Sequence, residues 1–278
     1  MTLRDENAYA TEDAGDRAKE AADHLVKWIQ DQVRSAHAKG VIFGLSGGVD
    51  SAVVGALCKE AFPQQSLALI LPCESLPEDI DDAWLVAKHF DLRTFEVDLT
   101  PAFRTLMDTF GSIRNGPEKP EKNISTSEGN GGFRRVALAR ANLKPRLRMI
   151  ALYYFANLLG YMVVGTGNRS EITVGYFTKY GDGGVDILPL ANLVKKEVRA
   201  LARHLGVPQR IIDKPPTAGL WRGQTDEGEM GITYEDLDRY LLEGVGTPEL
   251  VSVVEGMRLR SEHKRQPPAK PPTISKSN

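Results

Sequence analysis

Short apolar segments alternate with helical segments along the first part of the chain. The apolar segments run into Gly, Pro or charged residues, as buried β-strands do. Strands are expected at 41–44, 66–72 and 93–99, and helices follow them at 51–62, 77–90 and 100–110. Strands that alternate with helices of about ten to fifteen residues are typical of parallel sheets with helices on both faces. The pattern therefore predicts an α/β fold with a doubly wound parallel sheet.

Further elements extend this pattern toward the C-terminus. We expect a long helix at about 134–160, a strand at 161–165, and helices at 16–36, 192–205 and within 233–260. No internal repeat is present, and a length of 278 residues is compatible with one or two domains, of which we expect a single domain over residues 16–265. We expect residues 1–15 to be disordered, residues 111–132 to form a mobile loop, and residues 266–278 to form a flexible tail.

The run 149–168 contains twenty uncharged residues, which is the length of a membrane span. Asn157 and three glycines interrupt this run, and its pattern changes midway. Its first part favours the buried end of a helix, and its second part favours a short strand that runs into a glycine turn. We therefore expect no membrane segment. The acidic N-terminus also lacks the apolar core of a signal peptide.

The charge and the cysteine content of the chain limit which ligands it is expected to bind and in which cellular compartment we expect it. The 35 Lys and Arg residues against 37 Asp and Glu residues give a formal net charge of −2. Nucleic-acid binding is therefore not expected, and an anionic ligand must be met by local groups. Cys58 and Cys73 stand alone, which excludes a thiolate zinc site and a disulfide framework. Their scarcity fits a reducing compartment, so we expect a cytoplasmic protein.

A glycine-rich loop joins the first strand to the helix after it. It reads Gly44-Leu45-Ser46-Gly47-Gly48-Val49-Asp50-Ser51. Glycines at such a junction allow backbone N–H groups to surround an anion, and the helix N-terminus adds the positive end of its dipole. The loop lacks the lysine of a Walker A motif and carries Asp50 as a cation ligand instead. A plain glycine turn is the alternative, but chance agreement with SGGxDS at this place is rare.

This loop resembles the pyrophosphate loop of the ATP pyrophosphatase superfamily, whose members cleave ATP between its α and β phosphates. Two further segments, GTGNRSE at 165–171 and FTKYGDGGVD at 177–186, are similar to segments of the NAD synthetases in particular. The likeness covers about residues 20–270 in the family's order and continues at 143–149, 216–218, 220–227 and 263–265. The chain thus resembles the NAD synthetase family.

The resemblance implies an adenine-nucleotide α-hydrolase-like fold and the last step of NAD biosynthesis. In that reaction ATP adenylates the nicotinate carboxylate of deamido-NAD, pyrophosphate leaves, and ammonia displaces AMP to form the amide. A carboxylate resists nucleophiles because its charge repels them and oxide is a poor leaving group; adenylation removes both obstacles. The leaving pyrophosphate is strongly anionic, so N–H donors, Mg²⁺ and a lysine are expected around it.

The resemblance also implies roles for individual residues. The backbone of 44–51 would bind the ATP phosphates, Asp50 and Glu171 would hold Mg²⁺, and both would act with Lys195 in catalysis. Asp50 and Glu171 each follow a strand end, and the carboxyl ends of parallel strands meet at one edge of a sheet. The other implied contacts are Thr166, Lys195 and Thr217 to ATP, and Arg146, Lys179, Asp186, His263 and Lys264 to deamido-NAD.

The nitrogen donor and the partners are also expectations. Glutamine-dependent relatives carry an added amidase domain with a nucleophilic Cys, whereas only 40 residues precede the first strand here and neither cysteine is placed for that role. We therefore expect free ammonia as the substrate. The resemblance implies a homodimer with deamido-NAD near the subunit interface. The uncharged helix at 149–160 and the helix that carries Trp28 are the two candidate interface faces, although core packing explains both equally well.

Two other functions are alternatives. Another enzyme with a pyrophosphate loop, either amidating or tRNA-modifying, would share the first motif, but the chain has no basic surplus and no cysteine set for sulfur chemistry. A non-catalytic nucleotide-binding module would not need Asp50 and Glu171 together.

The segment after residue 219 departs from the acidic loop of common bacterial enzymes, which leaves the roles of Trp221 and Gln224 open. Trp221 is either a buried anchor or a stacking surface for substrate.

Overall fold

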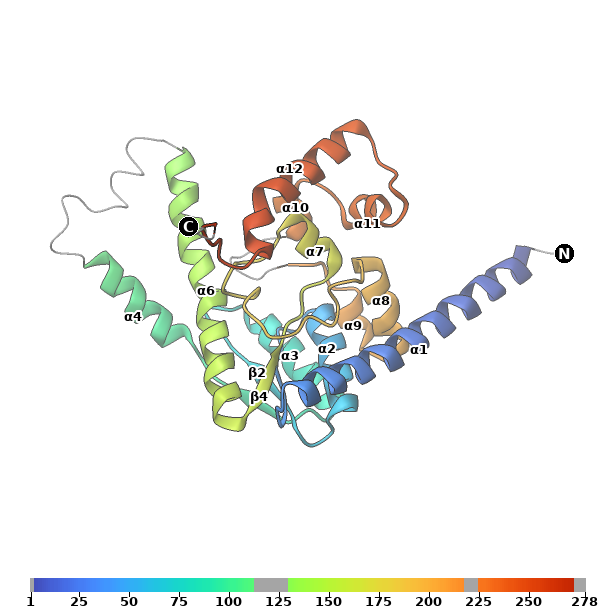
Figure 1. Cartoon of the computed structure of the whole chain (residues 1–278), viewed down its shortest axis with the longest axis horizontal. Coiled ribbons are helices and arrows are strands. Elements are labelled where there is room, and N and C mark those ends of the chain that lie inside the picture. The colour runs from blue at the N-terminus through green and yellow to red at the C-terminus, as the bar shows by residue number, and fades with distance from the viewer. Residues whose placement is uncertain (1–2, 113–129, 218–224, 273–278) are drawn as a thin grey trace, which may run out of the picture.

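A four-stranded parallel sheet forms the centre of the protein (Figure 1). The computed structural model describes residues 3–112, 130–217 and 225–272. The strands are β1 (Gly40–Gly44), β2 (Ser66–Ile70), β3 (Thr94–Glu96) and β4 (Tyr161–Val164), in the spatial order β3-β2-β1-β4. In β1, Val41 pairs with Ser66 of β2 and Gly40 pairs with Tyr161 of β4. The predicted α/β fold with a parallel sheet is confirmed.

The strand order reverses direction beside β1. From β1 the chain builds the sheet outward through β2 to β3, and it then returns to place β4 on the other side of β1. Connections that leave two neighbouring strands in opposite directions open a crevice at their carboxyl ends, and ligands of α/β proteins bind in such crevices. The loops that follow β1 and β4 therefore lie at the expected place for a ligand site.

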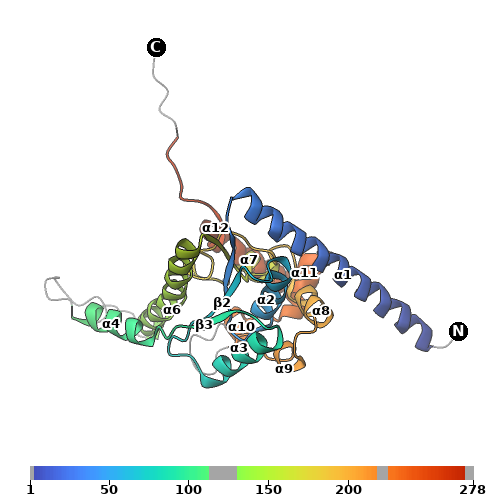
Figure 2. The same cartoon turned by 90° about the horizontal axis from the view of Figure 1, so that it is seen from below.

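Helices cover both faces of the sheet, and the alternation of side chains along β1 separates the two cores. Val41 and Phe43 belong to the larger core, and Ile42 belongs to the smaller one, which includes residues of α6 (Asn130–Leu159). The larger core contains residues of α1 (Leu3–Ser35), α2 (Val49–Ala61), α3 (Pro77–His89), α8 (Lys195–His204) and α9 (Gln209–Ile212). Neighbouring strand residues face opposite sides, so a strand covered on both faces needs an unbroken apolar run. The helix α4 (Thr100–Gly111) packs beside α6 (Figure 2).

Four helices from the second half of the chain form a separate, smaller cluster. They are α7 (Arg169–Val174), α10 (Asp226–Met230), α11 (Tyr234–Glu243) and α12 (Pro248–Arg265). Val174, Tyr234, Leu237 and Val254 are buried between them. These helices stand over the edge of the sheet at which the strands end (Figure 1). The cluster therefore faces the loops that follow β1 and β4.

The N-terminal helix corrects one prediction. We expected disorder through residue 15 and a helix from Asp16, but α1 begins at Leu3. The segment 3–15 is polar, which suggested disorder, yet it contains several Ala and Glu residues with high helix propensity. Its acidic residues also favour the N-terminal end of a helix dipole.

The remaining boundaries differ from expectation by small amounts. The long helix α6 begins at Asn130, and α4 ends at Gly111, so both take in ends of the expected loop 111–132. The middle of that loop and the last six residues of the expected tail lie outside the described residues. Neither α7 nor α10 was predicted, because five or six residues are too few to show a helical period.

The uncharged run at 149–168 divides into a helix end and a strand as predicted, but the helix end is buried on one face only, because Ile150, Tyr154 and Leu158 are exposed. Its first part ends α6, its second part is β4, and the glycine turn follows. Among the described helices, none combines the length and the apolar character that a membrane crossing requires.

Candidate functional site

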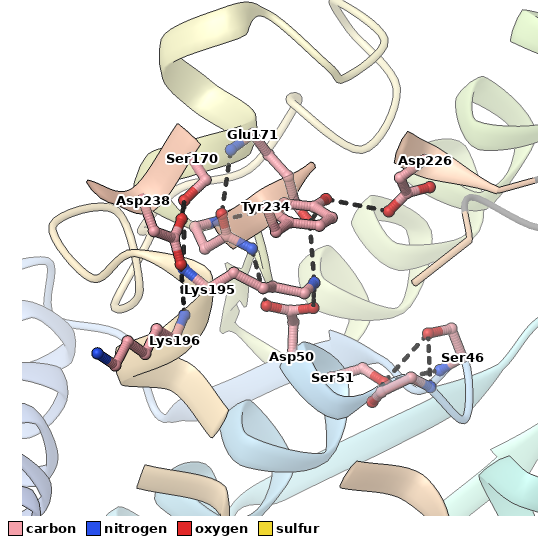
Figure 3. Close-up of polar contacts among 12 residues, drawn as sticks. Ser46, Asp50, Ser51, Ser170, Glu171, Lys195, Lys196, Asp226, Tyr234 and Asp238 are labelled. Carbon is pink, nitrogen blue, oxygen red and sulfur yellow. Dashed lines mark hydrogen bonds and ion pairs between the residues drawn. The ribbon is translucent and has the colours of Figure 1, made fainter. Parts of the chain in front are cut away.

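The glycine loop lies between β1 and α2, and Ser51 in the first turn of α2 ties it together. The hydroxyl of Ser51 accepts from the backbone N–H of Ser46 at 3.2 Å and donates to the carbonyl oxygen of Gly48 at 2.9 Å. The two serine hydroxyls lie 3.1 Å apart (Figure 3). Gly48 is the N-cap residue of α2 and has no side chain to cap the first N–H groups. The loop therefore presents a helix N-terminus of the kind that binds phosphate.

We expect Gly47→Ala to destabilise the protein by about 3 kcal/mol, because the loop and α3 leave no room for a side chain. Gly47 has a φ of +79°, and a Cβ there would lie 2.7 Å from the carbonyl oxygen of Asp79 and 2.8 Å from Cβ of Asp82. Urea unfolding measures the effect. The control is Gly48→Ala, whose Cβ would lie no closer than 3.4 Å to Ser46 Oγ. Equal stability of the two variants would contradict this account.

Asn168 links the loop after β4 to the glycine loop. Its side-chain oxygen accepts from the N–H of Glu171 at 3.0 Å, and Glu171 Oε2 accepts from the N–H of Asn168 at 3.2 Å, which is a capping box for α7. Asn168 Nδ2 also donates to Asp50 Oδ1 at 2.9 Å. Asn168 is fully buried and belongs to the GTGNRSE segment, but the sequence assigned it no role. Its bonds orient both carboxylates.

The structure brings Asp50, Glu171 and Lys195 together (Figure 3). The places of Asp50 and Glu171 after strand ends predicted that these two would meet, whereas Lys195 was expected from the family resemblance alone. Lys195 Nζ donates to Asp50 Oδ2 at 2.5 Å and to Glu171 Oε1 at 3.3 Å. The side chain of Lys195 is only 3% exposed. These contacts join residues as far as 145 positions apart in the sequence.

Asp226 and Tyr234 complete this cluster, and the sequence analysis missed both. The hydroxyl of Tyr234 donates to Asp226 Oδ2 at 3.0 Å and lies 3.4 Å from Glu171 Oε1. Lys195 Nζ lies 5.0 Å from the centroid of the Tyr234 ring, which is within cation–π range. Asp226 belongs to the family-like segment 220–227, so that segment held a signal for it. The sequence around Tyr234 shows only an aromatic residue at the start of a helix, which does not mark it as a site residue.

The cluster holds three carboxyl groups and one ammonium group. Burial raises the pKa of Glu171 to about 7; the ammonium of Lys195 opposes this shift and the charge of Asp50 adds to it. Burial also raises the pKa of Asp226. Burial lowers the pKa of Lys195, but the carboxylates of Asp50 and Glu171 outweigh burial and raise it overall. Lys195 is therefore protonated, and the ionised cluster carries excess negative charge.

Asp50 and Glu171 fit the donor chemistry of Mg²⁺. Within the described part of the chain, no group of three or more His, Cys, Asp or Glu side chains is arranged to hold a metal by itself. Mg²⁺, however, is commonly bound by one or two carboxylates, with waters and substrate phosphates completing its shell. The two carboxylates beside the glycine loop meet this requirement, and the excess negative charge favours a divalent cation.

A cavity of about 970 Å³ lies over the glycine loop. It is lined by Thr166, Thr217, Asp226, Lys264 and the Asp50–Glu171–Lys195 cluster. Nearly all of the residues expected to bind ATP line it, namely Gly44, Leu45, Ser46, Gly48, Val49, Asp50, Ser51, Thr166, Lys195 and Thr217. The exception is Gly47, which packs against α3. Trp221 and Gln224 lie outside the described residues.

Among the described residues, four of those expected to bind deamido-NAD are not in the cavity wall: Arg146, Lys179, Asp186 and His263. Three of them form a group between α6 and the end of α12. Arg146 Nη2 donates to the carbonyl oxygen of Lys179 at 3.4 Å, and Lys179 Nζ donates to the carbonyl oxygen of His263. These three residues thus lie outside the cavity wall, next to the wall residues Pro145, Thr178 and Lys264.

Asp186 and Lys264 are engaged in bonds within the chain. Asp186 accepts from the hydroxyl of Tyr153 at 2.9 Å and from the N–H of Val163 at 2.7 Å, which ties its loop to β4. Lys264 Nζ donates at 2.8 Å to the carbonyl oxygens of Gly175 and Phe177. Lys264 reaches the cavity wall and follows His263 in α12, so it connects the two groups of residues.

Comparisons with known proteins agree with this site. The family described as NAD synthase matches residues 21–268. The NH(3)-dependent NAD(+) synthetase of Carboxydothermus hydrogenoformans is 51% identical over 254 residues, which cover 91% of this chain and 97% of that protein. The protein of the same name from Syntrophomonas wolfei is 46% identical over 246 residues, which cover 88% and 93% of the two chains.

Solved structures show the same likeness. NMN synthetase from Francisella tularensis superposes with a TM-score of 0.81 at 35% identity and covers 91% of this chain and 98% of its own. The NH3-dependent NAD synthetase from Campylobacter jejuni superposes with a TM-score of 0.70 at 25% identity, covering 92% and 99%. Since the family match spans most of the chain and the glycine loop, the carboxylates and the lysine meet in one site, this protein belongs to the NAD synthase family.

Proposed function

We propose that the protein catalyses the ATP-dependent amidation of deamido-NAD by ammonia, which yields NAD, AMP and pyrophosphate through an adenylated carboxylate. The observation that carries this proposal is the meeting of Asp50, Glu171 and Lys195 beside the uncapped N-terminus of α2. A module that only binds nucleotide has no need for buried, mutually repelling carboxylates next to the phosphates, because burying them costs stability. A reaction that expels pyrophosphate does need them.

Each group in the site has a role in the proposed adenylation step. An oxygen of the nicotinate carboxylate attacks the α-phosphorus of ATP, and charge develops on the departing pyrophosphate. The N–H groups of the loop 44–51 hold the phosphates, and the ammonium of Lys195 faces the developing charge. Mg²⁺, bound by Asp50 and Glu171, would supply further neutralisation of the phosphates. An oriented donor of this kind typically lowers the barrier by about 3–4 kcal/mol.

For deamido-NAD, the group of Arg146, Lys179 and His263 supplies positive charge and donors outside the ATP cavity. Lys264 lies next to His263 and reaches the cavity wall, so a dinucleotide could span both regions. The proposed reaction requires that its nicotinate end lie near the ATP phosphates. Asp186 would have to exchange one of its present bonds for a substrate contact. These five residues remain the proposed binding set for deamido-NAD.

Free ammonia is the proposed nitrogen donor. Two relatives that are 51% and 46% identical to this chain are named NH(3)-dependent NAD(+) synthetase, whereas a glutamine-dependent NAD+ synthetase from Acinetobacter baumannii is 26% identical. We place the reaction in the cytoplasm, where ATP and reduced thiols are found, because Cys58 and Cys73 are both free.

The purified protein with deamido-NAD, ATP, Mg²⁺ and ammonium should release NAD, AMP and pyrophosphate in equal amounts. A second reaction with nicotinate mononucleotide in place of deamido-NAD tests the likeness to an NMN synthetase. If kcat/KM is higher with nicotinate mononucleotide, that compound replaces deamido-NAD as the proposed substrate. Release of ADP and phosphate, or a requirement for tRNA, would refute the proposed reaction.

A homodimer is the proposed assembly, and α6 offers a face for it. Ile150, Tyr154 and Leu158 follow one another at intervals of four, so they form a stripe along the helix, and they are 59%, 64% and 68% exposed. Three large apolar side chains exposed in a row are typical of an interaction surface. We propose that this stripe packs against a second copy of the chain.

Tyr154→Asp combined with Leu158→Asp should convert the dimer into a monomer, because two charges would have to be buried in the interface. Sedimentation equilibrium measures the change, with at least about a 100-fold weaker dimer expected, which is the effect of roughly 3 kcal/mol. Leu259→Asp is the control: Leu259 is 66% exposed on α12 and should leave the dimer intact. A dimer that survives the double substitution would place the interface elsewhere.

A further inference from the structure

Asp238 of α11 is a buried carboxylate that the proposed reaction does not use. It is 3% exposed, and its two oxygens face the starts of α7 and α8, the helices that carry Glu171 and Lys195 (Figure 3). We infer that Asp238 is a positioning residue that holds Glu171 and Lys195 in their places through Ser170 and the backbone of α8. This inference rests on the roles proposed above for Glu171 and Lys195.

The first turn of α8 takes its cap from Asp238. Val194 is the N-cap residue, and its apolar side chain cannot accept a hydrogen bond; its own N–H donates to Glu197 Oε2 at 2.9 Å. The N–H of Lys196 donates to Asp238 Oδ2 at 2.7 Å. A carboxylate at this place also interacts favourably with the positive end of the helix dipole. An aspartate at the N-cap position accepts a hydrogen bond from an N–H group of the first turn, and Asp238 does the same for α8 from another helix.

Ser170 extends this contact to α7. The Ser170 hydroxyl donates to Asp238 Oδ1 at 2.6 Å and accepts from the N–H of Lys195 at 3.2 Å. Ser170 is fully buried and directly precedes Glu171. One carboxylate therefore fixes the backbone of Lys195 and Lys196 and also the residue next to Glu171.

The reaction requires this precision because Lys195 reaches its partners with a flexible side chain. Its Nζ must lie between Asp50 Oδ2 and Glu171 Oε1, at 2.5 and 3.3 Å. A displacement of about 1 Å at a catalytic group can cost on the order of 100-fold in rate. Among the described residues, Asp238 is not part of the cavity wall, so it acts on the reaction through Ser170 and the helix backbone and not by touching substrate.

Asp238→Asn keeps the shape of the side chain but removes its negative charge and replaces one accepting oxygen with a donor, so the Ser170 hydroxyl can no longer donate to it while the other oxygen keeps the Lys196 N–H. We expect kcat per folded protein to fall about 10- to 100-fold while the KM values for ATP and deamido-NAD change little. Ser170→Ala removes the bond from the Lys195 N–H and the bond to Asp238 Oδ1 but keeps the bond between the Lys196 N–H and Asp238 Oδ2, and kcat should fall about 10-fold. Circular dichroism and the unfolding midpoint give the folded fraction of each variant.

The matched control is Asp236→Asn. Asp236 lies on the same helix, its side chain is 43% exposed, and it bonds to Thr233 and Arg239 close by. Its variant should keep the kcat of the native protein. If Asp238→Asn lowers the unfolding midpoint but leaves kcat per folded protein at the Asp236→Asn level, Asp238 is merely structural and the inference is overturned.

A combined variant separates this inference from the proposed function. In a Lys195→Met background, Asp238→Asn should cause a much smaller loss of kcat than in the native protein, since the part of its effect that passes through Lys195 is gone and only the part that passes through Glu171 remains. A full additional loss in that background would overturn the inference. If Lys195→Met alone retained the native kcat, the proposed role of Lys195 would be refuted, whatever the result for Asp238.

Discussion

Lys195→Met is expected to lower kcat for NAD formation by about 100- to 1,000-fold, because it removes the oriented cation beside the glycine loop. Methionine has a similar length and keeps the packing of α8 but cannot face the charge of the departing pyrophosphate. Steady-state release of pyrophosphate measures the loss, and the KM for deamido-NAD should change far less, since Lys195 lies on the ATP side of the cavity.

The same variant should lose stability. It leaves Asp50, Glu171 and Asp226 without the buried ammonium group, and breaking such a cluster costs about 3–5 kcal/mol of unfolding free energy. Added Mg²⁺ should restore part of this loss, because a bound cation compensates the carboxylates.

Lys196→Met is the matched control for both effects. Lys196 is exposed, its side chain points away from the cluster in Figure 3, and only its backbone N–H contacts Asp238. It should retain native kcat and stability. Equal activity of the Lys195 and Lys196 variants would remove Lys195 from the reaction.

Glu171→Gln should also lower kcat by about 100-fold or more, yet raise the free energy of unfolding by roughly 1 kcal/mol at pH 8 without Mg²⁺. We expect kcat to fall because the variant lacks one of the two proposed magnesium ligands. The free energy of unfolding rises because burial raises the pKa of Glu171 to about 7, so the ionised carboxylate destabilises the folded protein at pH 8. Catalytic groups are commonly held at the expense of stability in this way.

The pH dependence distinguishes this explanation from a general change in packing. Between about pH 4.5 and 7 the folded state binds more protons at Glu171 than the unfolded state does, so the native protein loses stability as pH rises. Glutamine does not titrate. The difference in unfolding free energy between Glu171→Gln and the native protein should therefore grow from pH 5 to about pH 7 and then level off.

Urea unfolding at several pH values, with Mg²⁺ chelated, measures this difference. Glu60→Gln, at an exposed position near the end of α2, is the control and should keep native activity. A difference that stays constant from pH 5 to 8 would contradict the raised pKa of Glu171. Added Mg²⁺ should reverse the order of stability, because only the native carboxylate supplies the second ligand.

Elements with a clear period could be predicted, and elements without one could not. The strands and the helices α2, α3 and α6 came from apolar runs and spacing that depend on near neighbours alone. The start of α1 was misplaced because polar composition resembles disorder even where helix propensity is high. The helices α7 and α10 are held by caps, Asn168 and Thr225, that periodicity does not register.

The site was predictable only in part for a related reason. The glycine loop and the positions of Asp50 and Glu171 after strand ends could be found in local motifs. Tyr234 and Asp238 could not, because each acts through contacts with segments many residues away, and the only signal for Asp226 was its place in the segment 220–227. The bond between Ser170 and Asp238, for example, joins positions 68 residues apart. The position of Arg146 and His263 outside the cavity wall was equally invisible to motif matching.

The sequence by itself thus determined the α/β fold, the phosphate-binding loop and the family, because strand and helix periods and glycine-rich turns are local properties of the chain. Tertiary structure alone decided which carboxylates surround Lys195, that the pKa of Glu171 is raised, and that Asp238 supports both helices of the site. Burial and the distance between charges depend on how remote segments pack, and no local pattern carries that information.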